Sequence, residues 1–333
     1  MTVSISGSLG VTFPDSSLQT GAASPYVTKN RLVNGSFAID QRNAGASQTF
    51  TAAAAVAYTV DRWYGSCTGA NITGQRVAGT SPNQYAYRFT GAASNTGTLF
   101  GQRIESFNTY DLISTTITGS VTLKSSSITS VTWTAYYANS SDTFSSKTQI
   151  ATGTLTINST ATRYSFSFDA GANAGNGIAI EFTTGALTAT NTLQYENAQL
   201  EIGSSATPFE RRLYNQELAN CQRYYFKNKA VNVDSLFGSG LNEDTTYAYG
   251  MSYFPVPMRT NPTALEQTGT ASDYRIRTTG ATNTTCNGVP TFIGASTQIA
   301  WTSFQVASGL TAGQGSFPRA AVSSAYLAWS AEL

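Results

Sequence analysis

The sequence predicts an all-β protein, and three observations carry that prediction. Apolar and aromatic residues alternate with polar ones over most of the chain, which is the period of a strand with one buried and one solvated face. The alternating runs are short and end in clusters of Gly, Asn and Ser, which are typical of turns between antiparallel strands. No repeat of about 20–50 residues is found, which disfavours solenoids and propellers.

The clearest alternation of apolar and polar residues marks six runs that we predict to be strands. In one of these runs Trp133 and Tyr137 fall on one face and Tyr136 falls on the other. The runs with this pattern cover 131–137, 164–168, 178–182, 193–202, 247–253 and 327–329.

One segment has a helical period instead. Tyr214, Leu218, Cys221 and Tyr225 stand at offsets of four, seven and eleven residues, on one face of a helix that Asn215 can cap. About three turns are too few for an independent helix, so we expect it to dock against a neighbour. It divides the chain into an N-terminal arm (1–29), a first β domain (30–212), a helical connector (213–229) and a C-terminal β domain (230–333).

Two further segments are expected to lie outside central strands. The run 238–246 is predicted to be a loop, and Pro255, Pro257 and Pro262 confine their stretch to edges and turns. In the arm, a turn at 14–17 follows Val11 and Phe13 and makes at most one hairpin. A lone hairpin is marginal in water, so we expect the arm to pair with another chain.

The composition excludes several classes of protein. The 333 residues include 19 Lys+Arg, 18 Asp+Glu and no His, and 11% are charged, against about 25% in soluble proteins. A net charge of +1 without a basic run argues against nucleic-acid binding. The lack of His removes Ser-His chemistry and nearly every zinc site. No apolar run of about 18 residues predicts a membrane span, and no secretory signal is recognised at the start.

The remaining reactive residues favour simple interpretations. The three cysteines, Cys67, Cys221 and Cys286, are far apart, so we expect reduced thiols. Asn242-Glu243-Asp244 is an isolated acidic cluster without the pattern of a calcium loop, and we expect a solvated turn there. No cofactor and no metal ion is predicted.

Several strings resemble segments of tailed-phage tail fibres with a jelly-roll domain of the carbohydrate-binding type. They are NRLVNGSF (30–37), DRWY (61–64), QRIE (102–105), the stretch from Gln199 to Tyr225, PMRTNPT (257–263) and the ending SAEL (330–333). The segment GVTFPD (10–15) resembles an N-terminal piece of such virion proteins. The stretch 199–225 is the most specific of these strings.

The resemblance implies a jelly-roll β-sandwich over 30–212 and a β-sandwich-like knob over 230–333. It also implies a receptor-binding subunit of the virion, assembled in the host cytoplasm as a homotrimer, which adheres to host surface glycans without catalysis. Residues 1–29 would attach it to other virion proteins, and loops of the C-terminal domain would contact the receptor. Two alternatives stay open: a capsid head fibre or decoration protein, and a polysaccharide-depolymerising tailspike.

Sugar binding needs aromatic platforms and short polar side chains. The candidates are Tyr136, Trp63, Trp301 and Tyr326, and for each of them a place in the hydrophobic core is the competing interpretation. Hydrolysis would need two facing carboxylates, for which Glu105 and Glu181 are candidates, but no catalytic residue is predicted. Glu210-Arg211-Arg212 is expected to pin the helix to the first domain, with an anionic sugar as the alternative.

Overall fold

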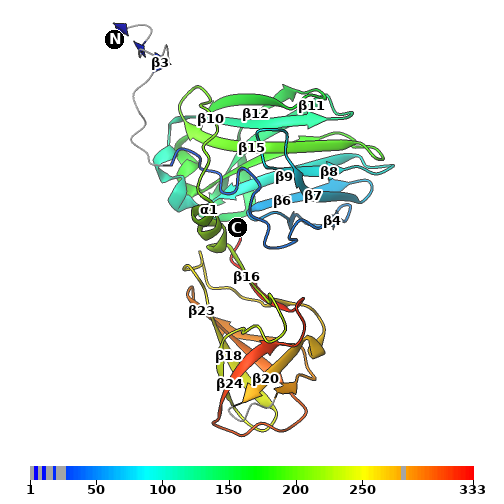
Figure 1. The fold of residues 1–333 in the computed structure, drawn as a ribbon. Coiled ribbons are helices and arrows are strands. Elements are labelled where there is room, and N and C mark those ends of the chain that lie inside the picture. Colours follow the sequence, from blue (N-terminus) through cyan, green and yellow to red (C-terminus); the bar gives the residue numbers. More distant parts are fainter. Residues whose placement is uncertain (1–3, 7–9, 13–17, 20–27, 279–282) are drawn as a thin grey trace.

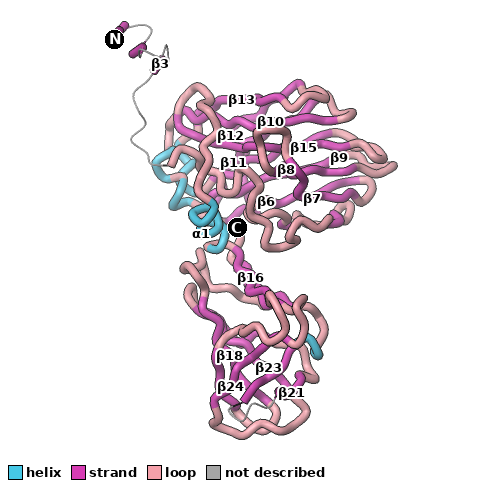
Figure 2. The backbone as a smooth tube through the Cα atoms, viewed as in Figure 1, coloured by secondary structure: helices cyan, strands magenta, loops and turns pink. Residues whose placement is uncertain are grey.

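The computed structural model describes residues 28–278 and 283–333, together with the strand residues 4–6, 10–12 and 18–19. Within these residues the chain is almost entirely β-structure and forms two bodies that meet at one short helix (Figures 1 and 2). Strands β1 (Ser4–Ser6), β2 (Gly10–Thr12) and β3 (Leu18–Gln19) pair antiparallel in that order. The arm therefore pairs as three strands where a single hairpin was expected, and its predicted turn at 14–17 lies outside the described residues.

The larger body is a jelly-roll β-sandwich, as predicted, made of two six-stranded antiparallel sheets within the described residues. The first sheet runs β13 (Thr162–Asp169), β10 (Thr116–Ser125), β15 (Thr192–Ile202), β8 (Tyr85–Thr90), β7 (Ile72–Ala78) and β4 (Gln48–Phe50). The second runs β12 (Thr143–Thr156), β11 (Ser130–Ser140), β14 (Ile178–Thr184), β9 (Gly97–Ile104), β6 (Trp63–Thr68) and β5 (Ala57–Tyr58). Short 3₁₀ turns η1 (Ser106–Asn108), η2 (Tyr110–Leu112) and η3 (Ala172–Asn176) join some of these strands.

An aromatic core seals the sandwich. The ring of Trp63 stacks on Phe100 at 4.8 Å between centroids, and Phe100 stacks in turn on Tyr87 at 4.9 Å. Trp133 stacks on Phe166 at 4.2 Å across the two sheets. Stacked and edge-on pairs add to the burial of these large rings, so this ladder fixes the distance between the sheets.

The smaller body packs a three-stranded sheet against a seven-stranded one. The first contains β16 (Tyr225–Lys229), β25 (Tyr326–Ser330) and β19 (Glu266–Gln267). The second runs β21 (Asn283–Thr285), β20 (Tyr274–Thr278), β24 (Gly315–Ala320), β17 (Ser239–Asn242), β18 (Tyr247–Tyr253), β23 (Ile299–Gln305) and β22 (Thr291–Ala295). Phe226 and Trp329 of the small sheet meet Tyr274 and Phe304 of the large sheet in one core, and η4 (Ala271–Asp273) closes one side.

The connector differs from its prediction in three ways. The helix α1 is Tyr214–Gln222, whereas Tyr225–Lys229 forms strand β16, because this segment pairs with β25 over five residues. Asn215 does not cap the helix: Leu213 precedes it with an extended backbone. The buried helical residues are Glu217 and Cys221, while Tyr214 is exposed.

The predicted loop at 238–246 is partly wrong, and the predicted free thiols are confirmed. The run predicted as a loop, 238–246, contains strand β17 before a short turn, because Leu241 and Asn242 continue a ladder with β18. Asp244 holds that turn: it accepts from the backbone N–H groups of Thr246 and Tyr247, and these bonds lower the pKa of its carboxyl. All three cysteines are free thiols and buried.

Candidate functional site

The outer face of the seven-stranded sheet exposes a group of aromatic and aliphatic side chains. Along β18 the even-numbered residues are buried and small, while Tyr249, Met251 and Tyr253 point to the other side. Along β23 Trp301 points to that same side, because it lies directly opposite Met251 in the register of the two strands. The three-stranded sheet covers the inner face, and nothing in the described part of the chain covers the outer one.

We call this surface the aromatic face. Its seven members are Leu241, Tyr249, Met251, Tyr253, Ile293, Trp301 and Phe317. Tyr253 is 68% exposed, Leu241 51% and Trp301 37%. Leu241 lies directly opposite Tyr249, and Met251 lies directly opposite Trp301. Directly opposed residues have Cβ atoms about 5 Å apart, so the members of each pair are neighbours on the surface. Grouped exposed apolar side chains are typical of interaction sites.

Polar groups border the aromatic face. The exposed hydroxyl residues Ser239 and Thr291 lie on the same side of the sheet, opposite Met251 and Ser303 respectively. Tyr249 hydrogen-bonds the Glu243 carboxylate, which raises the pKa of the phenol. Arg277 lies opposite Phe317 at one edge. The surface therefore combines flat rings with hydroxyls and few charges.

Of the four residues predicted from the sequence, Trp301 is the one that the structure places on this face. Trp63 is fully buried, donates its indole N–H to the carbonyl oxygen of Asn34 at 3.1 Å, and is unreachable for a ligand. The prediction that Trp63 contacts a ligand is therefore wrong, because its side chain points from strand β6 into the core between the two sheets.

The other two predicted rings lie elsewhere. Tyr326 lies in the small sheet, donates to the carbonyl oxygen of Gln267 at 3.1 Å and has the ammonium of Lys227 over its ring at 4.0 Å. Tyr136 lies on the outer side of its jelly-roll sheet, opposite to the core side of Trp133, as predicted. It is only half-buried there, with the Lys147 ammonium 4.1 Å from the ring centroid. The structure thus does not bring the four predicted residues together.

The acids considered for hydrolysis are tied into local contacts. Glu105 is buried and pairs with Arg223, with oxygen and nitrogen 3.1 Å apart. Glu181 is buried too, pairs with Lys147 and accepts from the Tyr64 hydroxyl at 2.8 Å. Among the described residues, no three His, Cys, Asp or Glu side chains gather closely enough to hold a metal ion. No helix in the described residues is long and apolar enough to span a membrane.

A cavity of about 290 Å³ lies beside the start of α1, lined among others by Tyr85, Asn197, Phe209 and Arg211. The Glu-Arg-Arg sequence at its wall mainly holds the connector. Glu210 accepts from the backbone N–H of Asn30 at 2.6 Å, and Arg212 donates to the carbonyl oxygen of Leu32 at 3.3 Å and pairs with Glu217. This agrees with the expectation that the sequence pins the helix to the jelly roll.

The neighbours of Trp301 on the aromatic face were missed from sequence, although their alternation along 247–253 was visible. In the structure the small residues Ala248, Gly250 and Ser252 face the core, and the large residues between them face outward. A strand with large residues on one side is ordinarily expected to bury that side, and the sequence contains no information about which side a second sheet covers.

No protein-family model and no curated protein sequence matches this chain. Some solved structures have a similar fold at low identity. A family 61 carbohydrate-binding module solved with β-1,4-galactotriose is 12% identical, covers 53% of this chain and all of its own, and has a TM-score of 0.33. A family 11 carbohydrate-binding module from Clostridium thermocellum is 14% identical, covers 50% of this chain and all of its own, and has a TM-score of 0.32.

The enzymatically active domain of tailspike protein 4 from bacteriophage CBA120 is 12% identical, with a TM-score of 0.33. That match covers 52% of this chain and 21% of the tailspike. Similarities of this size describe the outline of a fold and identify no ligand for this chain.

Proposed function

We propose that the chain is a non-catalytic adhesion subunit of a phage virion fibre that binds host-surface glycans through the aromatic face. The observation that carries the proposal is the cross-strand pair of Met251 and Trp301, flanked by Tyr253, on an exposed sheet face. A rigid antiparallel sheet holds these side chains in fixed register, so the platform exists before a ligand arrives.

The chemistry of the face suits a pyranose. A sugar ring has an apolar C–H side that packs on aromatic faces and hydroxyl groups around its rim that need hydrogen-bond partners. Trp301 and Tyr253 supply the first, and the phenol of Tyr249 and the hydroxyl of Ser239 supply the second. The chain as a whole has a net charge of only +1, so long-range charge attraction contributes little to recognition.

The arrangement of the acids supports binding without hydrolysis. A glycosidase of the usual kind places two carboxyl groups about 5–10 Å apart on either side of an open cleft. Glu105 and Glu181 are instead buried and each pairs with a cation. The tailspike alternative predicts that this chain releases reducing ends from host polysaccharide, and that Glu105→Gln or Glu181→Gln abolishes the release. We expect no release from the wild-type chain.

The proposal includes assembly as a homotrimer attached to the particle through residues 1–29, which rests on the resemblance in sequence. Edge strands such as β4 and β22 are unpaired on one side in the single described chain, and pairing with sister chains would protect them from aggregation. Immunogold labelling of particles separates the fibre from the head-decoration alternative: label at the tail tip supports the first, and label over the whole shell supports the second.

A glycan array probed with the full chain tests the proposed function. We expect retention of glycans from the host surface by the wild-type chain and loss of retention in Trp301→Ala. Sedimentation of the same variant separates ligand binding from self-association. If Trp301→Ala converts the assembly to monomers, the aromatic face is a contact between copies and its assignment to glycans is wrong.

A further inference from the structure

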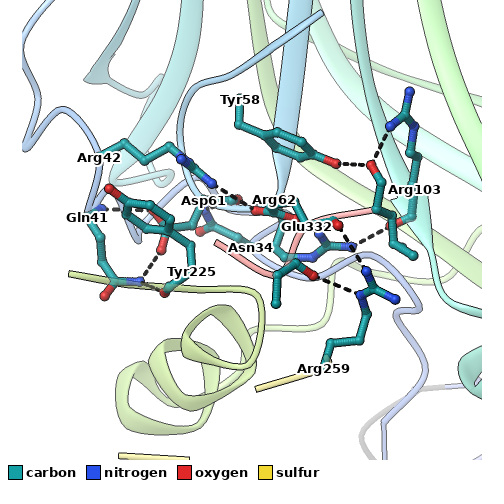
Figure 3. Close-up of polar contacts among 12 residues, drawn as sticks. Asn34, Gln41, Arg42, Tyr58, Asp61, Arg62, Arg103, Tyr225, Arg259 and Glu332 are labelled. Atoms are coloured by element: carbon teal, nitrogen blue, oxygen red, sulfur yellow. Dashed lines mark hydrogen bonds and ion pairs between the residues drawn. The ribbon is translucent and has the colours of Figure 1, made fainter. Parts of the chain in front are cut away.

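The last two residues of the chain leave the C-terminal domain and lie against the jelly roll. Strand β25 ends at Ser330, and Ala331 still belongs to the core of the C-terminal domain. Glu332 lies among jelly-roll residues such as Arg62 and Tyr58 (Figure 3), and Leu333 accepts from Tyr58 and Arg103. The mark at the chain's end in Figure 1 accordingly lies at the junction beside α1, away from the tip of the smaller body. Each of the three residues meets a different kind of partner.

Glu332 is held by two arginines of the jelly roll. Its carboxylate pairs with Arg62, which is 1% exposed, and with Arg42 at 3.5 Å. Burial is the largest single effect on Arg62 and would lower its pKa, but the Glu332 charge together with smaller contributions from neighbouring groups outweighs it, and the pKa is raised. A buried guanidinium needs such a partner, because an unpaired charge in the interior is strongly destabilising. Arg62 thus requires a carboxylate at this place.

Aromatic rings from the connector complete the acid-binding part of the site. The guanidinium of Arg62 lies 3.5 Å from the ring centroid of Tyr224, and that of Arg42 lies 3.6 Å from the ring centroid of Tyr225. Planar stacking fixes the orientation of both guanidinium groups toward the carboxylate. The acid-binding part therefore forms only where the jelly roll and the connector meet.

Leu333 fills a separate apolar site. Its side chain packs against Ala138, Phe144 and Ala179 beside Tyr136. Its carbonyl oxygen accepts from the Tyr58 hydroxyl at 2.7 Å and from Arg103. Burial raises the pKa of Tyr58 to about 12, and the nearby Glu332 charge adds to the effect. The phenol therefore keeps its proton and remains a donor at neutral pH.

The backbone of the segment is engaged as well. Ala331 donates its N–H to the carbonyl oxygen of Tyr224 at 2.8 Å. Arg259 donates to the carbonyl oxygens of Ala331 at 2.8 Å and Glu332 at 3.0 Å. These backbone bonds come from the connector and the C-terminal domain and hold the segment in place from that side. The jelly roll itself supplies a partner for the acid, an apolar pocket for the leucine and donors to its carbonyl oxygen, which are features by which proteins recognise a short chain segment.

We propose that the jelly roll carries a recognition site for an acidic residue followed by leucine, and that residues 331–333 occupy it in cis and set the angle between the two domains. The proposal is independent of glycan binding. The occupied site also covers part of the jelly-roll sheet next to Tyr136.

The test uses the full chain with spin labels on Ser159→Cys in the jelly roll and Thr311→Cys in the C-terminal domain. Both positions are exposed, and the native cysteines are buried. We expect a narrow distance distribution for the wild-type sequence. Glu332→Gln/Leu333→Ala is expected to broaden it and to lower the first melting transition by at least about 5 °C. Leu333→Ala alone is a milder variant that keeps the buried ion pair and is expected to broaden the distribution less.

Titration calorimetry with a peptide of the sequence of residues 329–333 is expected to show binding to the double variant and none to the wild type, whose site is filled in cis. The distance distribution of the double variant stays broad with this peptide, because a free peptide does not join the two domains. The same peptide with Gln in place of Glu is expected not to bind. Asp111→Asn, which removes an exposed pair with Arg31, is the matched control and should leave the distances unchanged. Unchanged distances in the double variant, or no binding of the peptide to it, would overturn the proposal.

Discussion

Asn34 and Gly35 hold the backbone at the start of the jelly roll in place. Asn34 is fully buried in the left-handed region at φ 58°, donates to the carbonyl oxygens of Ile39 and Asp61, and accepts from the N–H of Ile39. A Cβ on Gly35 would lie 2.1 Å from the carbonyl oxygen of Ala198. The two residues thus tie three separate segments of backbone together.

Replacing Asn34 by alanine should therefore be costly. Asn34→Ala leaves the buried N–H of Ile39 and the buried carbonyl of Asp61 without this partner, while the Ile39 carbonyl keeps the N–H of Asp61. We therefore expect the free energy of unfolding to fall by about 2 kcal/mol or more. Denaturant unfolding followed by tryptophan fluorescence measures this change. Asn139→Ala, at an exposed position, is the control and should change stability by less than about 0.5 kcal/mol. Equal stabilities of the two variants would contradict this role for Asn34.

Asp61 gives the fold a dependence on pH. It is fully buried, and desolvation raises its pKa to about 6 despite hydrogen bonds from Gln41. Because the pKa is higher in the folded than in the unfolded state, its contribution to stability is fully present below about pH 4 and is lost as the pH rises through about 6. The shift corresponds to a loss of up to about 3 kcal/mol.

The comparison of the wild-type chain with Asp61→Asn isolates this effect. From pH 4 to pH 7 the wild-type free energy of unfolding should fall relative to that of the variant, which lacks the titrating group. Urea unfolding at several pH values provides the measurement. A difference between the two proteins that is constant over this range would show that Asp61 titrates normally.

At the scale of elements, the helix α1 depends on its contacts with the jelly roll. Nine residues are too few for a stable isolated helix. Glu217 anchors it: the carboxylate accepts from the backbone N–H of Asn34 and pairs with Arg212 at 3.3 Å. An acid near the helix N-terminus also complements the helix dipole. The sequence suggested an apolar stripe for docking, but a buried acid does more of the docking.

Glu217→Ala should release the helix. The substitution leaves Arg212 half-paired and the Asn34 N–H unbonded, so we expect a loss of about 2–4 kcal/mol in stability. Hydrogen exchange of the α1 amides should become faster in the same variant. Gln216→Ala, one residue earlier and exposed, is the matched control. Unaltered exchange in Glu217→Ala would mean that other contacts hold the helix.

The element types were largely predictable, whereas their limits were not. The runs 131–137, 178–182 and 247–253 all lie in strands, because alternation reports directly on a half-buried ladder. Strand β16 was missed because its pairing partner β25 is distant in sequence and no local signal encodes that pairing. Strand β17 pairs with the neighbouring β18, but it was missed because its sequence, Ser-Gly-Leu-Asn, is rich in residues typical of turns. Trp63 could be assigned to a strand from the sequence, but which side of that strand is buried depends on the packing of the two sheets.

At the scale of the whole molecule, two bodies are joined by a charged contact that the sequence did not reveal. Arg42, Arg62, Glu332 and Leu333 are separated by up to about 290 positions along the chain, and only the folded topology brings them together. The aromatic face has a similar origin, because it depends on which side of a sheet receives the three-stranded sheet. Composition nevertheless indicated the general character of the surface, which is rich in Ser and Thr at about a quarter of the chain.

The central claim is that the aromatic face binds glycans, and a binding titration on Trp301→Ala tests it most directly. Titration calorimetry would compare the wild-type chain, Trp301→Ala and Tyr110→Ala with one glycan retained on the array. Tyr110 is an exposed ring of the jelly roll at 72% and is the matched control. We expect at least about tenfold weaker binding for Trp301→Ala and an unchanged affinity for Tyr110→Ala. Wild-type affinity in Trp301→Ala would contradict it.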